Sequence, residues 1–247
     1  MARMKDNSVN MVFADPPFNI GKQYNGFKDK NLTYYDWCNS WVKECFRILD
    51  YTGTFYLMTI DRHLEEKFPM MKKYGVFINQ IKWRNVSAAH DKRRFWNATQ
   101  PILVYGKTDK YKFKTYAQTR NISPENMRWG GYSTEPKGQL LDYWDDIPFV
   151  YAGSIAHPEA ILKQGTNQKE HPCQMPTGLI ERAMLFSTDV EETVYDPFMG
   201  SGTTAIACIK LGRNFIGSEI SAGYTALANR RIDEVRKQVC MFSPSEF

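Results

Sequence analysis

The chain is organised around one stretch near its start, Val9-Asn10-Met11-Val12-Phe13-Ala14-Asp15-Pro16-Pro17-Phe18. Its apolar run, residues 9–14, predicts a short buried strand. The two prolines remove backbone donors and force an extended turn, so the strand ends there. An acid at the carboxyl end of a buried strand, followed by a rigid turn and an aromatic ring, is the usual geometry of a site in an open α/β sheet. The stretch therefore predicts an α/β fold with a site at this turn.

The turn suits the binding of a planar amino group. The Asp15 carboxylate and the carbonyls before and within the Pro16-Pro17 turn can accept hydrogen bonds, and the Phe18 ring offers a face on which a base can stack. The alternative interpretation is a surface turn in which Asp15 caps a helix. The four-residue pattern does not decide between the two, so a second signal has to support the site.

Length and composition bound the fold class. At 247 residues, with 43% hydrophobic content, the chain fits one α/β domain with an inserted or appended lobe. It has no run of about 18 uncharged apolar residues, as a membrane span needs, and its first residues are charged, so we expect a soluble, cytoplasmic protein. The five cysteines form no Cys-x-x-Cys pair and the four histidines show no metal-ligand spacing. We therefore expect reduced thiols and no metal.

The net charge of +5 is concentrated in one segment. Residues 82–120 contain ten Lys or Arg and two acids, a net charge of +8, whereas the remainder carries −3. Aromatic residues alternate with these cations, which suits phosphate neutralisation beside base stacking. The resulting candidates for nucleic-acid contact are Lys92, Arg93, Arg94, Trp96, Lys110, Lys112 and Lys114. A solvated lysine face is the alternative interpretation of such a charge run.

Periodicity and turn residues predict the remaining elements. They are, in order, a helix over 34–49, a turn over 51–53, strands over 54–60, 76–83 and 102–105, a helix over 177–186 and a strand over 193–196. Asp61 can cap a further helix that runs toward Tyr74 and is interrupted near Pro69. Prolines and glycines break up residues 112–165, so we expect a loop-rich lobe there that lies outside the main sheet.

The second signal follows the last of these strands, in Asp196-Pro197-Phe198-Met199-Gly200-Ser201-Gly202-Thr203-Thr204-Ala205. A helix to Leu211, a strand over 214–218 and Glu219 come next. Strand, glycine loop, helix, strand and acid form a nucleotide-binding half-unit, in which the glycines let the backbone approach the ligand and the acid meets ribose hydroxyls.

Other classes also use such a loop. Gly200, Gly202 and Ala205 have the dinucleotide spacing, with Glu219 at about the right distance. A dehydrogenase, however, would place this unit early, whereas only 45 residues remain after Gly202. No lysine follows the loop, which argues against a Walker motif. A structural role, in which the glycines merely permit close helix–sheet packing, stays open.

Together, Asp15-Pro16-Pro17-Phe18 and Phe198-x-Gly200-x-Gly202 resemble the S-adenosylmethionine-dependent amino-methyltransferases that act on DNA. The order of the motifs, catalytic first and cofactor last, is similar to that of the beta-type, circularly permuted members. Further stretches carry the resemblance, namely Ile81-Lys82-Trp83, Leu103-Val104-Tyr105-Gly106-Lys107, Trp144-Asp145-Asp146-Ile147-Pro148 and His171-Pro172-Cys173-Gln174-Met175-Pro176. The resemblance implies a Rossmann-like methyltransferase fold with a mostly parallel central sheet. It makes residues 1–111 the catalytic half, 112–165 a target-recognition lobe and 166–247 the cofactor-binding half.

The resemblance also assigns roles in binding S-adenosylmethionine. The methionine end of the cofactor would be lined by Asp196, Phe198, Gly200, Gly202 and Thr203. Its ribose hydroxyls would bind Glu219, and its other flank would be formed by His171, Pro172 and Gln174. The family commonly has Thr and Lys where this chain has Cys173 and Met175. Members usually have an extra segment before the first strand, whereas only residues 1–8 precede it here. We therefore expect part of the wall around the adenine ring to be either missing or built differently.

The implied chemistry is methylation of DNA at the exocyclic amino group of adenine. That nitrogen is a poor nucleophile because its lone pair is delocalised into the ring. If Asp15 accepts one amino hydrogen and the Pro16 carbonyl accepts the other, the nitrogen moves toward tetrahedral geometry and can attack the sulfonium methyl in line. The base would be flipped out of the duplex and stacked on Phe18, and no metal is required.

Several alternatives stay open at this point. Asp rather than Ser at the first motif position favours adenine, although the chemistry would serve cytosine, and phosphate contacts would also permit RNA. A DNA-binding partner subunit that keeps a cofactor pocket without catalysis, and a nicotinamide enzyme, are candidates from other classes. Because beta-type enzymes are often homodimers, we expect the same here.

Overall fold

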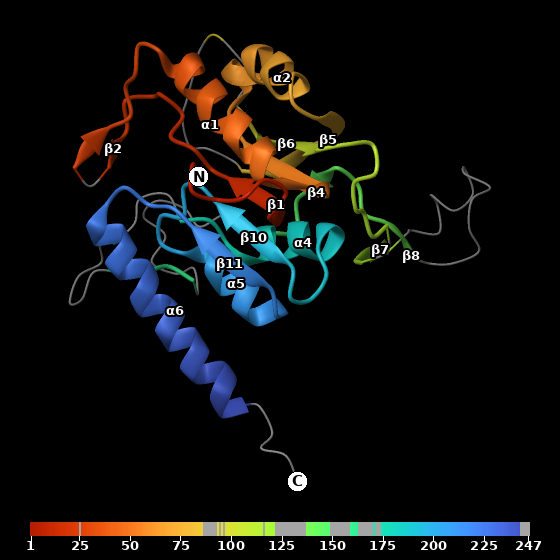
Figure 1. Ribbon diagram of the computed structural model, residues 1–247, viewed down its shortest axis with the longest axis vertical. Coiled ribbons are helices and arrows are strands. Elements are labelled where there is room, and N and C mark those ends of the chain that lie inside the picture. The colour runs from red at the N-terminus through yellow and green to blue at the C-terminus, as the bar shows by residue number, and fades with distance from the viewer. Residues whose placement is uncertain are drawn as a thin grey trace.

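The computed structural model describes residues 1–24, 26–85, 93, 95, 97–115, 117–121, 137–148, 159–162, 170 and 174–242. Its centre is a seven-stranded sheet with helices on both faces (Figure 1). The helices α1 (Tyr34–Ile48) and α2 (Leu64–Lys72) cover one face, and α4 (Thr177–Ser187) and α5 (Thr203–Leu211) cover the other. This three-layer arrangement confirms the predicted α/β, Rossmann-like fold.

The sheet runs in the order β11-β10-β1-β4-β6-β5-β9. Its strands are β1 (Val9–Ala14), β4 (Leu49–Met58), β5 (Val76–Arg84), β6 (Thr99–Gly106), β9 (Tyr143–Trp144), β10 (Thr193–Asp196) and β11 (Asn214–Gly217). In this sheet β6 runs antiparallel to β4 and β5, and the other pairings are parallel. The first strand of the chain thus lies between β4 and β10, and the carboxyl ends of β1 and β10 meet at one edge of the sheet.

Strand β1 supplies side chains to both hydrophobic layers. Met11 and Phe13 pack with residues of α4 and α5, whereas Val12 and Ala14 pack with residues of α1 and α2. All four side chains are fully buried. Burial of large apolar side chains contributes about 1.5–3 kcal/mol each, so the strand that ends at Asp15 is firmly fixed.

The turn predicted over residues 51–53 is wrong. Helix α1 ends at Ile48 and β4 begins directly afterwards. The Thr52 and Gly53 carbonyls accept hydrogen bonds from the backbone N–H groups of Lys112 and Lys107, which hold this part of the chain extended. A Cβ at Gly53 would lie 2.9 Å from the Asn10 carbonyl oxygen, so the glycine permits close strand packing instead of a turn.

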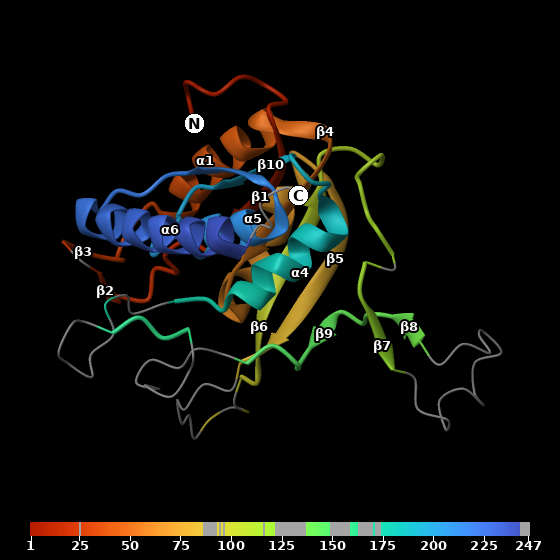
Figure 2. The same ribbon diagram turned by 90° about the horizontal axis from the view of Figure 1, so that it is seen from below.

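Two further expectations differ from the structure. Helix α2 continues through Pro69. One missing N–H does not break it because Met70 and Met71 are buried on its inner face. The segment 112–165 was expected to lie outside the main sheet, but its strand β9 pairs with β5, as Figure 2 shows. The buried Trp144 of β9 explains this pairing, because an indole of that size gains most when it packs into the core.

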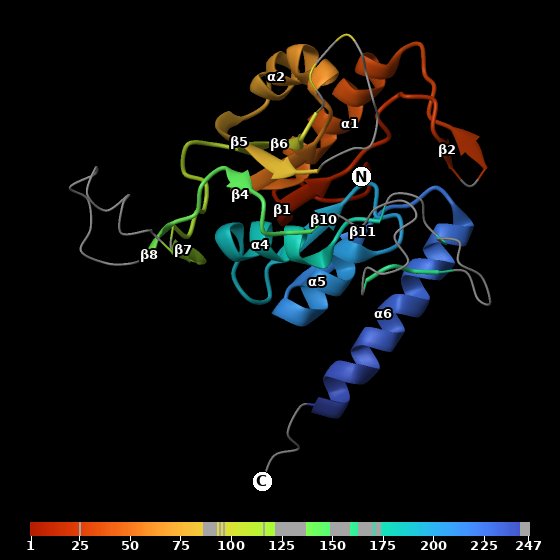
Figure 3. The same ribbon diagram turned by 180° about the vertical axis from the view of Figure 1, so that it is seen from behind.

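The shorter elements lie around the sheet. They are β2 (Gln23–Tyr24), β3 (Phe27–Lys28), η1 (Asp61–His63), β7 (Thr119–Asn121), β8 (Lys137–Gln139) and the long helix α6 (Ala222–Phe242). The β2–β3 hairpin and the start of α6 lie on the same side of the molecule (Figure 3). Within the described ranges, none of the helices has the length and apolar character of a membrane span.

Candidate active site

One pocket joins the two motifs predicted from the sequence. It has a volume of about 480 Å³ and lies beyond the carboxyl ends of β1 and β10. This volume falls within the range of roughly 300–1,000 Å³ that is usual for small-molecule sites. The predicted residues that line it are Asp15, Pro16, Pro17, Phe18, Asp196, Phe198, Gly200, Thr203 and Glu219. Tyr24, Trp37 and Tyr224 also line it, and no motif in the sequence predicted their role.

Asp15 lines this pocket and has an unsatisfied acceptor atom. Its Oδ1 atom is buried and has no hydrogen-bond partner in the part of the chain that the structure describes. Burial, and then the charge of Asp196, raise the pKa of Asp15 to about 7, against a smaller opposing effect of Lys22. A buried oxygen without a partner costs free energy, so the folded protein holds a group that a donor on a ligand would stabilise.

The proline corner that follows Asp15 is held from outside the motif. The Tyr34 hydroxyl donates to the Pro17 carbonyl at 2.9 Å, and the His63 ring donates to the Phe18 carbonyl at 2.8 Å. None of the described residues donates to the Pro16 carbonyl. The corner therefore keeps one carbonyl free beside the Asp15 carboxylate.

Asp196 is 2% exposed at the end of β10 and organises the second motif. Its carboxylate accepts hydrogen bonds from the Phe198 N–H at 2.9 Å and from the Thr204 hydroxyl at 2.5 Å. Burial is the main reason that the pKa of Asp196 rises to about 6, although both hydrogen bonds oppose the shift. The carboxylate thus fixes the two ends of the glycine loop relative to β10.

The glycine loop has a backbone that side chains would disturb. Gly200 and Gly202 have φ angles of 49° and 80°, in the left-handed region. A Cβ on Gly202 would lie 3.0 Å from the Ala228 Cβ of α6. Glu219 accepts hydrogen bonds from the Gly200 N–H at 3.0 Å and from the Ser221 N–H at 2.8 Å. The loop is therefore both close-packed and anchored to the acid predicted to bind ribose hydroxyls.

Of the three residues predicted to flank the cofactor, the structure describes only Gln174. Its amide oxygen accepts from the Ile161 N–H at 3.1 Å, and its amide nitrogen donates to the Glu159 carbonyl. The side chain is thus engaged in holding residues 159–161, and it does not line the pocket, although its neighbour Met175 does. His171 and Pro172 lie outside the described residues.

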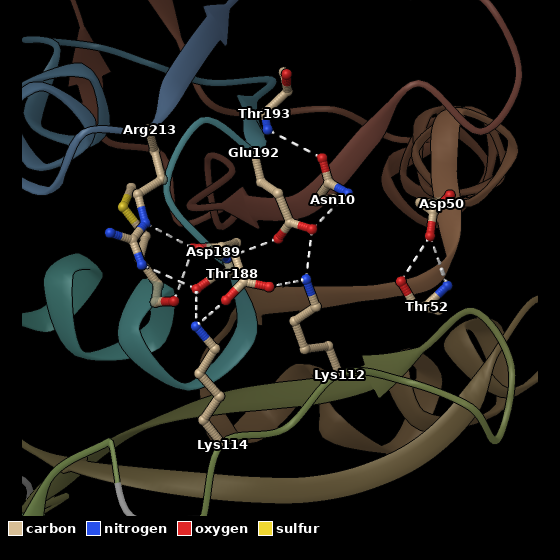
Figure 4. Close-up of polar contacts among 11 residues, drawn as sticks. Asn10, Asp50, Thr52, Lys112, Lys114, Thr188, Asp189, Glu192, Thr193 and Arg213 are labelled. Atoms are coloured by element: carbon tan, nitrogen blue, oxygen red, sulfur yellow. Dashed lines mark hydrogen bonds and ion pairs between the residues drawn. The ribbon is translucent and has the colours of Figure 1, made fainter.

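The basic residues predicted to contact nucleic acid fall into three groups. Lys92, Arg94 and Trp96 lie outside the described residues. Arg93 and Lys110 are exposed. Lys112 and Lys114 are involved in ion pairs within the protein (Figure 4).

This ion-pair network lies at the opposite end of β10 from the pocket. The Lys112 Nζ lies 2.5 Å from carboxylate oxygens of both Asp189 and Glu192, and Lys114 also pairs with Asp189. The two lysines lower the pKa of Asp189 to about 2. Their ion pairs indicate a structural role, and the DNA contact expected of Lys112 and Lys114 stays a prediction.

The comparisons with known proteins agree with this site. A family model for DNA methylases, N6_N4_Mtase, matches residues 9–230. DNA adenine methyltransferase YhdJ of Escherichia coli K12 is 29% identical over 242 residues, which cover 94% of this chain and 79% of the relative. Type II methyltransferase M.HpaI of Haemophilus parainfluenzae is 29% identical over 245 residues, covering 94% and 71%.

Solved structures have the same fold. The PvuII DNA methyltransferase, which is cytosine-N4-specific, superposes with a TM-score of 0.67 at 16% identity, covering 98% of this chain and 89% of that one. The complex of M1.HpyAVI with S-adenosylmethionine gives a TM-score of 0.58 at 23% identity, covering 93% and 90%. Because the family model spans both motifs and the pocket that they share, the chain belongs to the S-adenosylmethionine-dependent DNA methylases that act on exocyclic amino groups.

Proposed function

We propose that this protein methylates adenine at N6 in DNA, at a specific target sequence. The Escherichia coli relative, a DNA adenine methyltransferase, supports adenine as the base. The aspartate at position 15 supports the same choice, because serine in this place is the alternative that suits cytosine. The observation that carries the proposal is Asp15, which lines the same pocket as the glycine loop and whose Oδ1 atom has no partner among the described residues.

The residues present fit the cofactor. Gly200 and Gly202 have left-handed backbones that suit the close approach of a ligand, and Glu219, which lines the pocket, would bind the ribose hydroxyls. The Phe198 ring, which packs edge-on against Trp41 with centroids 5.0 Å apart, would line the methionine end of the cofactor. When bound, S-adenosylmethionine supplies an electrophilic methyl group on a sulfonium centre. Gln174 would act by holding residues 159–161, and His171 and Pro172 keep their proposed place on the flank.

Across the pocket, Asp15 and the Pro16 carbonyl are the acceptors for the amino group of the base. With one hydrogen on each acceptor, the nitrogen lone pair turns out of the ring plane and toward the donor side of the pocket. The ionised Asp15 carboxylate also stabilises the positive charge that develops on nitrogen. A base within a duplex does not reach such a pocket, so the target base is flipped out and stacked on Phe18.

Several further roles belong to the same proposal. Exposed Arg93 and Lys110 would contact the DNA backbone, together with Lys92, Arg94 and Trp96. The protein would work in the cytoplasm, as a homodimer and without a metal. Among the described residues, no three His, Cys, Asp or Glu side chains come together as a metal ion would need.

Transfer of tritium from methyl-labelled S-adenosylmethionine to unmethylated DNA tests the proposal. The wild-type protein should label DNA, and Asp15→Ala should lose at least about 100-fold of this activity while binding the cofactor with wild-type affinity. Asp109→Ala, which removes an exposed carboxylate far from the pocket, is the matched control and should keep full activity. Wild-type protein that binds both cofactor and DNA without labelling it would refute the proposed reaction.

A further inference from the structure

We infer that Tyr34 and His63 are positioning residues that select which carbonyl of the proline corner meets the target amino group. The inference rests on the proposed function. Three consecutive carbonyls follow Asp15, and each could turn toward a base. Tyr34 occupies the Pro17 carbonyl and His63 occupies the Phe18 carbonyl, so that the Pro16 carbonyl is left as the acceptor.

The corner needs such support because of its own chemistry. Pro16 and Pro17 lack N–H groups, so neither can be fixed by donating to a neighbouring strand. The Asp15–Pro16 and Pro16–Pro17 peptide groups therefore have no N–H, and the hydrogen bonds that the next two carbonyls accept, at Pro17 and Phe18, hold the corner in place. Both donors come from other elements, namely α1 for Tyr34 and η1 for His63. Neither side chain lines the pocket, so both act through the backbone.

The tautomer of His63 follows from its partners. A carbonyl oxygen only accepts, so the His63 Nε2 atom carries the hydrogen that bonds Phe18. In the neutral ring, Nδ1 then accepts from the Tyr35 hydroxyl at 2.8 Å. The side chain is 5% exposed, and burial lowers its pKa below the usual value, helped by the nearby charges of Arg62 and Lys67 and opposed by Glu66.

Protonation of His63 would not break its bond to Phe18. The imidazolium keeps the Nε2 hydrogen and gains one on Nδ1, so the Tyr35 hydroxyl would accept and turn its own hydrogen toward Glu66. Glu66 has a buried Oε2 atom without a partner among the described residues, and after burial it is the next cause that raises the pKa of Tyr35. The Phe18 carbonyl is therefore held in both charge states, as a positioning role requires.

Tyr34 is fixed in the same way by packing. It is 4% exposed, its ring lies 5.0 Å from the His63 ring, and the buried Lys67 ammonium lies 5.2 Å above it. Burial, with the neighbouring Cys38 as a smaller cause, raises the pKa of Tyr34, so its hydroxyl keeps the hydrogen that it donates. The two donors thus form one rigid block behind the corner.

The test uses variants that remove or restore one hydrogen bond at a time. Tyr34→Phe deletes a single oxygen, His63→Leu removes the donor, and His63→Gln supplies an amide N–H in a similar place. We expect Tyr34→Phe and His63→Leu to lower kcat for DNA methylation about tenfold or more, because small misplacements of catalytic groups are costly. The KM for DNA and the affinity for S-adenosylmethionine should stay within about twofold. His63→Gln should recover most of kcat.

Two readouts separate this role from others. Thermal melting with bound S-adenosylhomocysteine identifies a variant that merely unfolds, and kcat is compared only among folded variants. The pH profile of His63→Gln should keep the shape of the wild-type profile, since the ring is not the titrating group. The inference would be overturned if His63→Gln abolished the fall in activity at low pH, or if Tyr34→Phe kept the wild-type kcat. Either result would leave the proposed function intact. Wild-type protein without activity would instead refute the proposed function and the inference with it.

Discussion

The Asp196 charge raises the pKa of Asp15 across the pocket that both residues line. The two carboxyls end neighbouring parallel strands, β1 and β10, that come from opposite ends of the sequence. Burial is the larger cause of the shift, and together the two effects bring the pKa of Asp15 to about 7. Paired carboxyl groups with raised pKa values in a pocket are typical of functional sites.

The raised pKa of Asp15 predicts that the rate of DNA methylation depends on pH. Below about pH 7 the free enzyme holds a protonated Asp15, which accepts the amino hydrogen poorly. We therefore expect kcat/KM for DNA methylation to fall about tenfold per pH unit below 7 and to level off above it. Steady-state rates between pH 5 and 9 would check this.

Asp196→Asn should move this acidic limb to lower pH, because the variant removes the charge that raises the pKa of Asp15. The amide can keep both bonds of Asp196, accepting from the Phe198 N–H and donating to the Thr204 hydroxyl oxygen. An acidic limb at the wild-type pH would show that burial, and not the Asp196 charge, raises the pKa of Asp15.

The raised pKa of Asp15 also predicts that its buried charge destabilises the folded protein. The pKa of this acid is about 7 in the folded protein and 3.8 ordinarily, so the folded state binds more protons between pH 4 and 7. Its contribution to the free energy of unfolding therefore falls as the pH rises through this window. We expect Asp15→Asn to be about 1–3 kcal/mol more stable than wild type at pH 8 and equally stable at pH 4. Urea unfolding at both pH values measures the difference, and equal differences at both would exclude charge burial as the cause.

Gly202→Ala should damage the cofactor side of the pocket. A left-handed backbone costs about 1–2 kcal/mol for a residue with a Cβ, and the new atom would also meet the Ala228 Cβ. We expect a lower Tm and weaker binding of S-adenosylmethionine by calorimetry. Gly178→Ala is the matched control, because the nearest atom to its new Cβ would be 4.0 Å away and alanine favours helices. Cofactor affinity in Gly202→Ala equal to that of the control would contradict the role of the loop.

The position of Lys112 predicts a structural contribution. Its partners Asp189 and Glu192 precede β10, whereas the pocket follows β10. We expect Lys112→Met to lower the free energy of unfolding by less than about 1 kcal/mol, because partly exposed ion pairs contribute little, and to leave DNA affinity within twofold. Lys110→Met, at an exposed position, serves as the comparison. A drop in DNA affinity for Lys112→Met alone would contradict a purely structural role and support the DNA contact predicted from the sequence.

The sequence was sufficient for what depends on local patterns. The apolar run before Asp15 and the glycine loop after Asp196 each predict a strand that ends at a site, and parallel strands bring such ends together. Local reasoning failed at Gly53 and at residues 143–144. There, pairing with distant segments decides the conformation, and neither partner can be identified from neighbouring residues.

The supporting residues were missed for the same reason. Tyr34 and His63 looked like parts of a helix and a helix start, and only the fold brings them to the proline corner. Lys112 counted as one of many cations, since charge in a sequence does not reveal the acid that pairs with it. Motifs thus predicted the groups that face the ligand, whereas the residues that hold them required the coordinates.

Mass spectrometry of nucleosides from unmethylated DNA, treated with the purified protein and S-adenosylmethionine, tests the proposed reaction most directly. We predict N6-methyladenine as the methylated product with the wild-type protein, and none above background with Asp15→Ala. DNA that carries no methylated nucleoside although the protein binds the cofactor, or that carries equal amounts with both proteins, would contradict the role of the carboxylate and proline corner.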